Sequence, residues 1–181
     1  MDRRGTCART HGKQRPHRQD RARGELMPTQ PSKDPTAMAT SELETAWACS
    51  RVVHDFFHHY DHWRYGRMLD LYTPDGVWHR AGAALRGHAR ILEELERRPR
   101  NQRVAHVVTN LRVEPATAST ASATYYLTVY RHAGEIADDA AAPMAGPAML
   151  LAGTAGLVHT AQGWKFDSQT LTRRFEAGPA R

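Results

Sequence analysis

Residues 103–113 read RVAHVVTNLRV and are the most informative segment of the chain about its architecture. It is mostly apolar, and its length suits a β-strand. Strand alternation would place Val104, His106, Val108 and Asn110 on one face. A histidine and an asparagine on a largely apolar face suggest the wall of a ligand pocket. The alternative is a core histidine whose hydrogen bonds serve packing alone.

The chain after this stretch keeps the period of two. It predicts three further strands, at residues 121–132, 148–159 and 164–172. Residues 134–147 are rich in alanine, proline and glycine, and we expect a mobile loop there. Strands that follow one another directly predict antiparallel meanders.

The chain before this stretch has the 3.6-residue period of amphipathic helices. It predicts helices at residues 42–60, 64–72 and 88–98, and a strand at residues 76–80. Ser41 and Glu44 have the spacing of a capping box at the start of the first helix. Thr73-Pro74-Asp75-Gly76 predicts a turn before the strand. Helices followed by consecutive strands predict an α+β domain with helices on one face of a curved sheet.

The net charge of +6 over 181 residues is concentrated at the amino terminus. Residues 1–40 hold nine basic and four acidic side chains, whereas the rest of the chain holds 16 basic and 15 acidic ones. The first 40 residues also hold four prolines and few large apolar residues, so we expect a disordered basic tail. Residues 41–181 are expected to form the folded domain. The tail is read as an unstructured leader, or as sequence upstream of a true start at Met27 or Met38, rather than as a basic arm.

The composition of the domain argues against some classes of partner. Because residues 41–181 are nearly neutral, we expect no nucleic-acid partner. No run of 18 apolar residues exists, so a membrane span is not expected. The two cysteines, Cys7 and Cys49, cannot build a disulfide framework, which fits a reducing, cytoplasmic location.

Polar residues gather where the first predicted helix ends. His58 and His62 have the i, i+4 spacing of a zinc site, but no glutamate follows the first histidine and the helix is predicted to end near Tyr60. We therefore expect solvent-facing histidines and no metal site. Asp61 lies where an apolar stripe ends, so its carboxylate either caps a turn or points into a partly dry cavity.

Several short motifs occur together in a characteristic order. They are Tyr60-Asp61-His62-Trp63, Gly66-Arg67, Leu71 to Trp78, Leu85-Arg86-Gly87, Ala105-His106, Thr109 to Val113 and Gly163-Trp164-Lys165-Phe166. In these residues the chain resembles the SnoaL-like branch of the NTF2-like superfamily. The resemblance covers about residues 42–175. It implies a cone in which three N-terminal helices pack on a strongly curved mixed sheet around one apolar cavity.

The resemblance also implies site residues. Asp61 and His106 match the positions of a catalytic pair in dehydratase and dehydrochlorinase members, and Tyr60 matches a tyrosine beside that aspartate. We expect His106 to remove a proton next to a carbonyl while Asp61 holds its ring. The expected substrate contacts are His79, Asn110, Tyr126, Val108, Phe57 and Thr154. Phe56 replaces a lysine of the dehydrochlorinase members, which argues against dehydrochlorination.

The expected function is a lyase, isomerase or cyclase reaction without a cofactor, on a small apolar substrate of polyketide, steroid or aromatic type. A homodimer is expected from the resemblance. Two alternatives use the same fold without catalysis in this chain. One is a ligand-binding or dimerisation module, and the other is the small subunit of a ring-hydroxylating dioxygenase.

Overall fold

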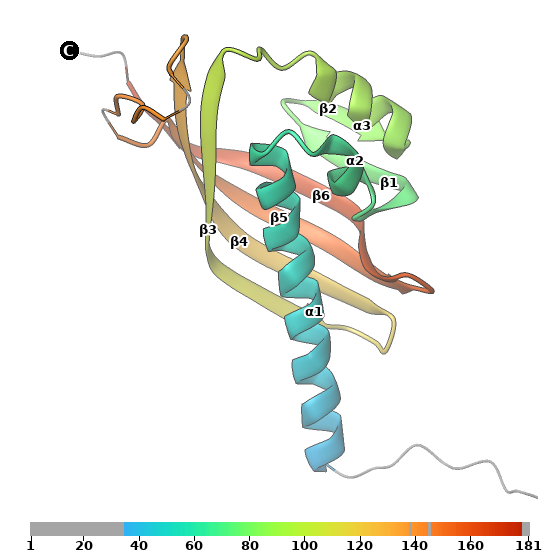
Figure 1. Cartoon of the computed structure of the whole chain (residues 1–181). Helices are drawn as coiled ribbons and strands as arrows, with labels where there is room; N and C mark the ends of the chain where they lie inside the picture. Colours follow the sequence, from blue (N-terminus) through green and yellow to red (C-terminus); the bar gives the residue numbers. More distant parts are fainter. Residues whose placement is uncertain (1–34, 138, 145, 179–181) are drawn as a thin grey trace, which may run out of the picture. The chain divides into compact units, whose positions relative to one another are not determined.

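The computed structural model describes residues 35–137, 139–144 and 146–178. They form one sheet with helices on one face, as Figure 1 shows. In chain order the elements are α1 (Pro35–Asp61), α2 (Tyr65–Leu69), β1 (Tyr72–Arg80), β2 (Ala83–Arg86), α3 (Gly87–Glu96), β3 (Gln102–Pro115), β4 (Thr120–Ala133), β5 (Met149–Thr160) and β6 (Gly163–Glu176). None of the helices described is both long and apolar enough to cross a membrane.

The sheet is mixed and has the strand order β2-β1-β6-β5-β4-β3. Neighbouring strands are antiparallel except β1 and β6, which run parallel. The α+β class, the antiparallel meander and the curved sheet covered by helices are confirmed. Sequence periodicity missed β2, because four residues are too few to show a period.

The amino-terminal boundary of the domain differs from the prediction. α1 begins at Pro35, so Ser41 lies inside the helix and does not cap it. Proline is well tolerated in the first helical turn, and Ala37 and Ala39 favour the helix that follows. Six residues assigned to the tail therefore belong to α1, while residues 1–34 of the predicted tail lie outside the described part of the chain.

The predicted turn at Thr73–Gly76 is an irregularity within β1. The pairing of β1 with β6 shifts register between Tyr72 and Val77. A Cβ atom at Gly76 would lie 2.9 Å from a ring carbon of Tyr72 and 3.0 Å from the carbonyl oxygen of Phe166. The glycine is therefore needed for close approach of β1 to β6 rather than for a reversal of the chain.

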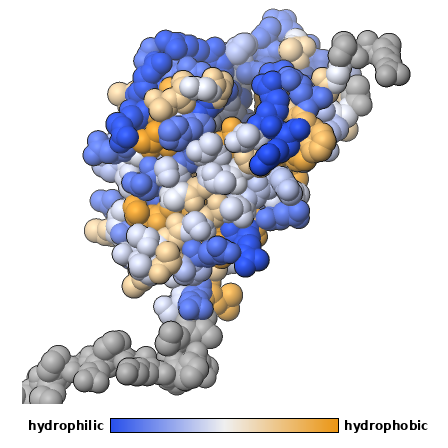
Figure 2. All heavy atoms as spheres, turned by 180° about the vertical axis from the view of Figure 1, so that it is seen from behind, coloured by the Kyte–Doolittle hydropathy of each residue, from blue (hydrophilic) through white to orange (hydrophobic). Residues whose placement is uncertain are grey.

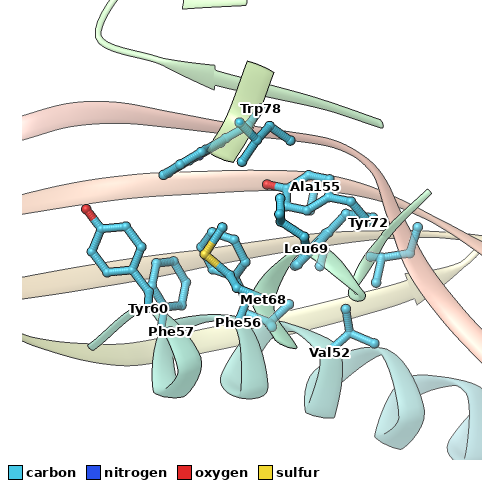
Figure 3. Close-up of a cluster of buried hydrophobic side chains, with 14 of the residues drawn as sticks. Val52, Phe56, Phe57, Tyr60, Met68, Leu69, Tyr72, Trp78 and Ala155 are labelled. Atoms are coloured by element: carbon cyan, nitrogen blue, oxygen red, sulfur yellow. The ribbon is translucent and has the colours of Figure 1, made fainter. Parts of the chain in front are cut away.

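The core lies between α1 and the concave face of the sheet. Figure 3 shows Val52, Phe56, Phe57 and Tyr60 rising from α1 toward the strands. The ring of Phe56 is fully buried and meets those of Tyr72, Trp78 and Phe166 edge-on at centroid distances of 5.6–5.8 Å. Burial of such a side chain contributes about 1.5–3 kcal/mol, so this cluster fixes α1 against the sheet.

Candidate active site

Asp61 and His106 meet where the end of α1 reaches the edge strand β3. The Nδ1–H of His106 donates to Asp61 Oδ1 at 2.5 Å. The backbone N–H of His106 donates to Asp61 Oδ2 at 2.8 Å. The side chains are only 9% and 16% exposed for His106 and Asp61, respectively. Each carboxylate oxygen thus accepts one donor from the same residue, and the predicted contact between the two side chains is confirmed.

This contact fixes the state of the imidazole ring. Because a carboxylate only accepts, the proton of a neutral His106 ring lies on Nδ1 and its Nε2 carries a lone pair. Among the described residues, Nε2 has no hydrogen-bond partner. A charge-assisted hydrogen bond to Asp61 also stabilises the imidazolium that forms when Nε2 takes up a proton.

The position of Asp61 is unfavourable without its partner. It is the last residue of α1, where the helix dipole disfavours negative charge. The two donors of His106 offset that cost. In return, Asp61 accepts an N–H on the open edge of β3, which would otherwise lack a strand partner.

Two aromatic side chains of α1 hold the His106 ring. The centroid of the Phe57 ring lies 5.3 Å from that of His106, and the Tyr60 centroid lies 5.0 Å away in an edge-on arrangement. Residues 57, 60 and 61 share one helical face because they are three and four positions apart. α1 thus supplies both the carboxylate and the packing of the imidazole.

His106 lines a cavity of about 860 Å³ under the sheet. The large apolar side chains of its wall come from α1 and five strands and are Phe56, Phe57, Tyr60, Trp78, Val104, Val129, Met149, Leu151 and Leu171. Asp61 lies behind the imidazole and lines a second hollow together with His62 and Trp63. The imidazole is therefore the member of the pair that a ligand in the first cavity meets.

Three further predicted residues line this cavity: Phe57, Tyr60 and His79. Phe57 and Tyr60 are buried in its wall. His79 is exposed, because alternation along β1 turns its neighbours Trp78 and Arg80 toward the interior. The inward-facing position at this end of β1 thus belongs to Arg80, which the sequence analysis did not select.

Val108 and Asn110 do not line the cavity, and their predicted place needs correction. Asn110 has a φ of 51° and lies where the pairing of β3 with β4 shifts register. Such a bulge inserts an extra residue and reverses the alternation, so Asn110 is exposed and Leu111 turns inward. Val108 keeps its inward direction but packs against the core beyond the cavity.

Tyr126 and Thr154 lie on the other face of the sheet, which also corrects the prediction. Tyr126 is 42% exposed, whereas its neighbour Tyr125 is 3% exposed and faces the core. Thr154 is exposed between the buried residues Gly153 and Ala155. The period of two identified both strands, but it does not say which of two neighbouring residues faces inward.

Arg98 is a site residue that sequence reasoning missed. Its side chain is buried, and Nη1 donates to the Tyr60 carbonyl and to the Tyr65 hydroxyl at 3.0 Å each. The guanidinium carbon lies 3.9 Å from the ring centroid of Tyr60 and 4.1 Å from that of Trp63. Burial raises the pKa of Tyr65 despite the nearby positive charge of Arg98. Arg98 thus fixes the end of α1 beside Asp61. In sequence it is one of three arginines around Pro99, a pattern that looks like a solvated helix end.

The exposed histidines on either side of Asp61 have local roles. His62 donates through Nδ1 to the His58 carbonyl at 2.7 Å, and their ring centroids lie 4.3 Å apart. Both side chains are exposed. Within the described residues, no three side chains of His, Cys, Asp or Glu gather as a set of metal ligands.

Structures from several bacteria share this arrangement of helices and strands. An NTF2-like protein with a cystatin-like fold from Novosphingobium aromaticivorans aligns with a TM-score of 0.64 at 16% identity, over 79% of this chain and 90% of its own. A proposed scytalone dehydratase from the same organism aligns with a TM-score of 0.61 at 16% identity, over 80% and 94% of the two chains. The hexachlorocyclohexane dehydrochlorinase LinA-type3 from Novosphingobium barchaimii aligns with a TM-score of 0.61 at 18% identity, over 77% and 92%.

These identities are low, so the alignments establish the NTF2-like fold alone. No curated protein matches the sequence. Residues 41–170 match the family described as SnoaL-like domain, over most of the chain. By this match and by its fold, the chain belongs to the SnoaL-like domain family.

Proposed function

We propose that this protein is a lyase, isomerase or cyclase that moves a proton on a small, largely apolar organic molecule, with His106 as the base and Asp61 as its partner. The observation that supports this most is the double hydrogen bond from His106 to Asp61. It leaves the lone pair of Nε2 free on a ring that lines a cavity large enough for a bicyclic or tricyclic ligand. The chemistry needs no group beyond these side chains.

The reaction would begin at a carbon next to a carbonyl. His106 Nε2 removes a proton from that carbon, and the electron pair of the broken C–H bond moves into the carbonyl to form an enolate. The Asp61 carboxylate stabilises the imidazolium that results. A positioned base of this kind contributes about 10²–10⁴-fold to the rate.

The enolate then determines the outcome. In an elimination, the enolate re-forms the carbonyl, a double bond forms as the β-hydroxyl leaves, and the imidazolium gives its proton to that hydroxyl, which departs as water. In an isomerisation the proton returns to a different carbon. In a ring closure the enolate carbon attacks a second carbonyl in the same molecule, and the new alkoxide takes the proton from the imidazolium.

Tyr60 is the proposed donor to the enolate oxygen. Its ring is 7% exposed and contacts the His106 ring, and among the residues described its hydroxyl has no hydrogen-bond partner. A hydroxyl directed at the developing negative charge would stabilise the transition state more than the ground state.

Proton exchange tests this proposal without knowledge of the natural substrate. The ketones 1-tetralone and 2-tetralone are incubated in D₂O, and loss of their α-proton signals is followed by ¹H NMR. We expect exchange above the buffer rate with the wild type, and a loss of about 10²–10⁴-fold in His106→Ala. His54→Ala is the matched control, because His54 is exposed on α1 and bonds only to the Ser50 carbonyl among the described residues. Equal exchange by wild type and His106→Ala would remove the base from the mechanism, and binding of the ketones without exchange would favour the ligand-binding alternative.

A further inference from the structure

We propose that Arg80 binds a carboxylate, so that the ligand of the cavity is an apolar molecule with one carboxylate group. This inference rests on the proposed function in one respect only, namely that the 860 Å³ cavity is the ligand site. It adds the charge of the ligand and the residue that recognises it.

The backbone at Arg80 is held in a defined place. Arg80 is the last residue of β1 and pairs with Ala83 of β2. The two residues between them, Ala81 and Gly82, have φ values of 48° and 83°, as in the tightest hairpin turns. Arg80 thus projects from a rigid hairpin end, on the same side of β1 as Trp78.

The side chain of Arg80 brings an unused donor to the cavity wall. Its Nη1 is buried, and so is Nε1 of Trp78, and neither has a hydrogen-bond partner in the described part of the chain. Both residues line the cavity. The guanidinium carbon lies 4.9 Å from the Trp78 ring centroid and 5.8 Å from that of Tyr60. These rings stabilise the charge but accept no conventional hydrogen bond, so a ligand acceptor would satisfy a donor of Arg80 that the described residues leave unpaired.

The other arginines of the wall are differently placed. Three have partners: Arg97 with Glu93 and Glu94, Arg98 with Tyr60 and Tyr65, and Arg173 with Glu176. Arg131 is exposed. Within the described residues, Arg80 is therefore the wall arginine that combines burial with a free donor.

The charge of the wall favours an anion. Five arginines line the cavity, against Glu94 as the one acidic residue among the described lining residues. An excess of positive charge on the wall of a partly apolar cavity raises the local concentration of anionic ligands. A carboxylate suits Arg80 best, because a guanidinium can donate two parallel hydrogen bonds to its two oxygens.

The place of Arg80 also agrees with the position of the base. The ring of Tyr60 contacts both the Arg80 guanidinium and the His106 imidazole. A carboxylate held at Arg80 would direct the apolar body of the ligand along Tyr60 toward His106. Arg80 therefore orients the ligand and takes no part in the proton transfer.

Binding of two matched probes tests the inference. Isothermal titration calorimetry near neutral pH compares 2-naphthoate with the neutral 2-naphthamide, which has nearly the same shape. We expect the wild type to bind the carboxylate about tenfold more tightly or better, the effect of one charged hydrogen bond. Arg80→Gln should reduce this preference to within about twofold. Arg112→Gln should retain the full preference, because Arg112 is exposed on β3 and pairs with Glu114.

A second variant separates the loss of the charge at position 80 from a loss of the fold. Arg80→Met keeps an unbranched side chain over Trp78 and removes the charge, and circular dichroism with thermal unfolding shows whether each variant is folded. The inference would be overturned if the wild type bound the two probes with equal affinity or bound neither at millimolar concentration. It would also be overturned if a folded Arg80 variant kept the preference for the carboxylate.

The probes also separate this inference from the proposed function. Neither 2-naphthoate nor 2-naphthamide has a proton that His106 could remove from a carbon next to a carbonyl. We therefore expect His106→Ala to retain the preference for the carboxylate while it loses exchange of the tetralones. Exchange that survives in His106→Ala alongside a preference that is lost in Arg80→Gln would contradict the proposed base and support the anion site.

Discussion

Gly153 lies directly opposite Tyr125 across the ladder of β5 and β4, and a methyl group at position 153 would approach ring carbons of Tyr125 to 2.2 Å. Tyr125 is 3% exposed and contacts Phe57, which in turn packs on the imidazole of His106. The absent side chain at position 153 therefore leaves space for a ring that supports the candidate site.

Gly153→Ala should destabilise the fold. Tyr125 would have to leave its place beneath Phe57, and overpacking of this kind costs about 1–3 kcal/mol. Urea unfolding measures the change. Gly66→Ala is the control, because no heavy atom lies within 4 Å of a Cβ built there and alanine favours the α2 helix. Equal stability of the two variants would show that β5 and β4 are not as close as described.

Gln169→Leu should also destabilise the fold, because it leaves the buried hydroxyls of two tyrosines without a hydrogen-bond partner. The buried Gln169 accepts from the Tyr72 hydroxyl at 2.7 Å and donates through Nε2 to the Tyr125 hydroxyl at 2.8 Å. A buried polar group without its partner costs about 1–3 kcal/mol, so both tyrosines contribute to the loss.

A triple variant tests whether the two tyrosine hydroxyls cause this loss of stability. In the triple variant Tyr72→Phe, Tyr125→Phe and Gln169→Leu, much of the stability should return, because no polar group then stays unpaired. Gln162→Leu is the control, since that glutamine is exposed. A triple variant no more stable than Gln169→Leu alone would contradict the bridging role of the glutamine.

Stability should fall in alkaline solution. Burial raises the pKa of Cys49 from 9.0 to about 11, and burial raises the pKa of both Tyr72 and Tyr125 above the ordinary 10.0. These groups ionise more readily in the unfolded chain, so their contribution to stability is complete below pH 9.0. The contribution of Cys49 is lost as the pH rises to about 11, whereas the loss from Tyr72 and Tyr125 begins only near their ordinary 10.0 and continues as the pH rises further. Urea midpoints measured across this range should decrease, and less steeply in Cys49→Ala. Constant midpoints would contradict the buried, neutral state of the three groups.

The expected homodimer can be tested on the outer face of the sheet. Val107 and Tyr126 are 44% and 42% exposed on neighbouring strands. Figure 2, which shows the molecule from behind, has hydrophobic spots among pale and hydrophilic residues rather than one continuous patch. We expect sedimentation velocity to detect a dimer that Tyr126→Lys weakens, while His54→Ala, an exposed position on α1, leaves it unchanged. A wild type that stays monomeric at high concentration would contradict this expectation.

Sequence reasoning identified the two residues at the centre of the site for physical reasons. The end of an apolar helical stripe placed Asp61, and the alternation of a strand placed His106. Both patterns are local, so one sequence shows them. The resemblance to a known family supplied the contact between them, which no local pattern contains.

The prediction of site residues failed where the position of a side chain depends on contacts that the local sequence pattern does not contain. The bulge at Asn110 reverses the faces of β3, and the sequence gives no sign of it except that asparagine tolerates a positive φ. Arg80 gains its role from Trp78, two residues before it on β1, and from Tyr60 of the distant α1. Arg98 gains its role from Tyr60 and from Trp63, which follows α1. Neither arginine differs in sequence from the many exposed ones.

The position of the proton on the His106 ring tests the role of His106 as the base more directly than any other property. ¹⁵N NMR of the imidazole, at a pH where the ring is neutral, reports which nitrogen carries the proton. The double hydrogen bond to Asp61 predicts a proton on Nδ1 and a lone pair on Nε2, and a loss of this preference in Asp61→Asn. A neutral ring protonated on Nε2 in the wild type would leave the cavity without its base and rule out the proposed role of the Asp61–His106 pair.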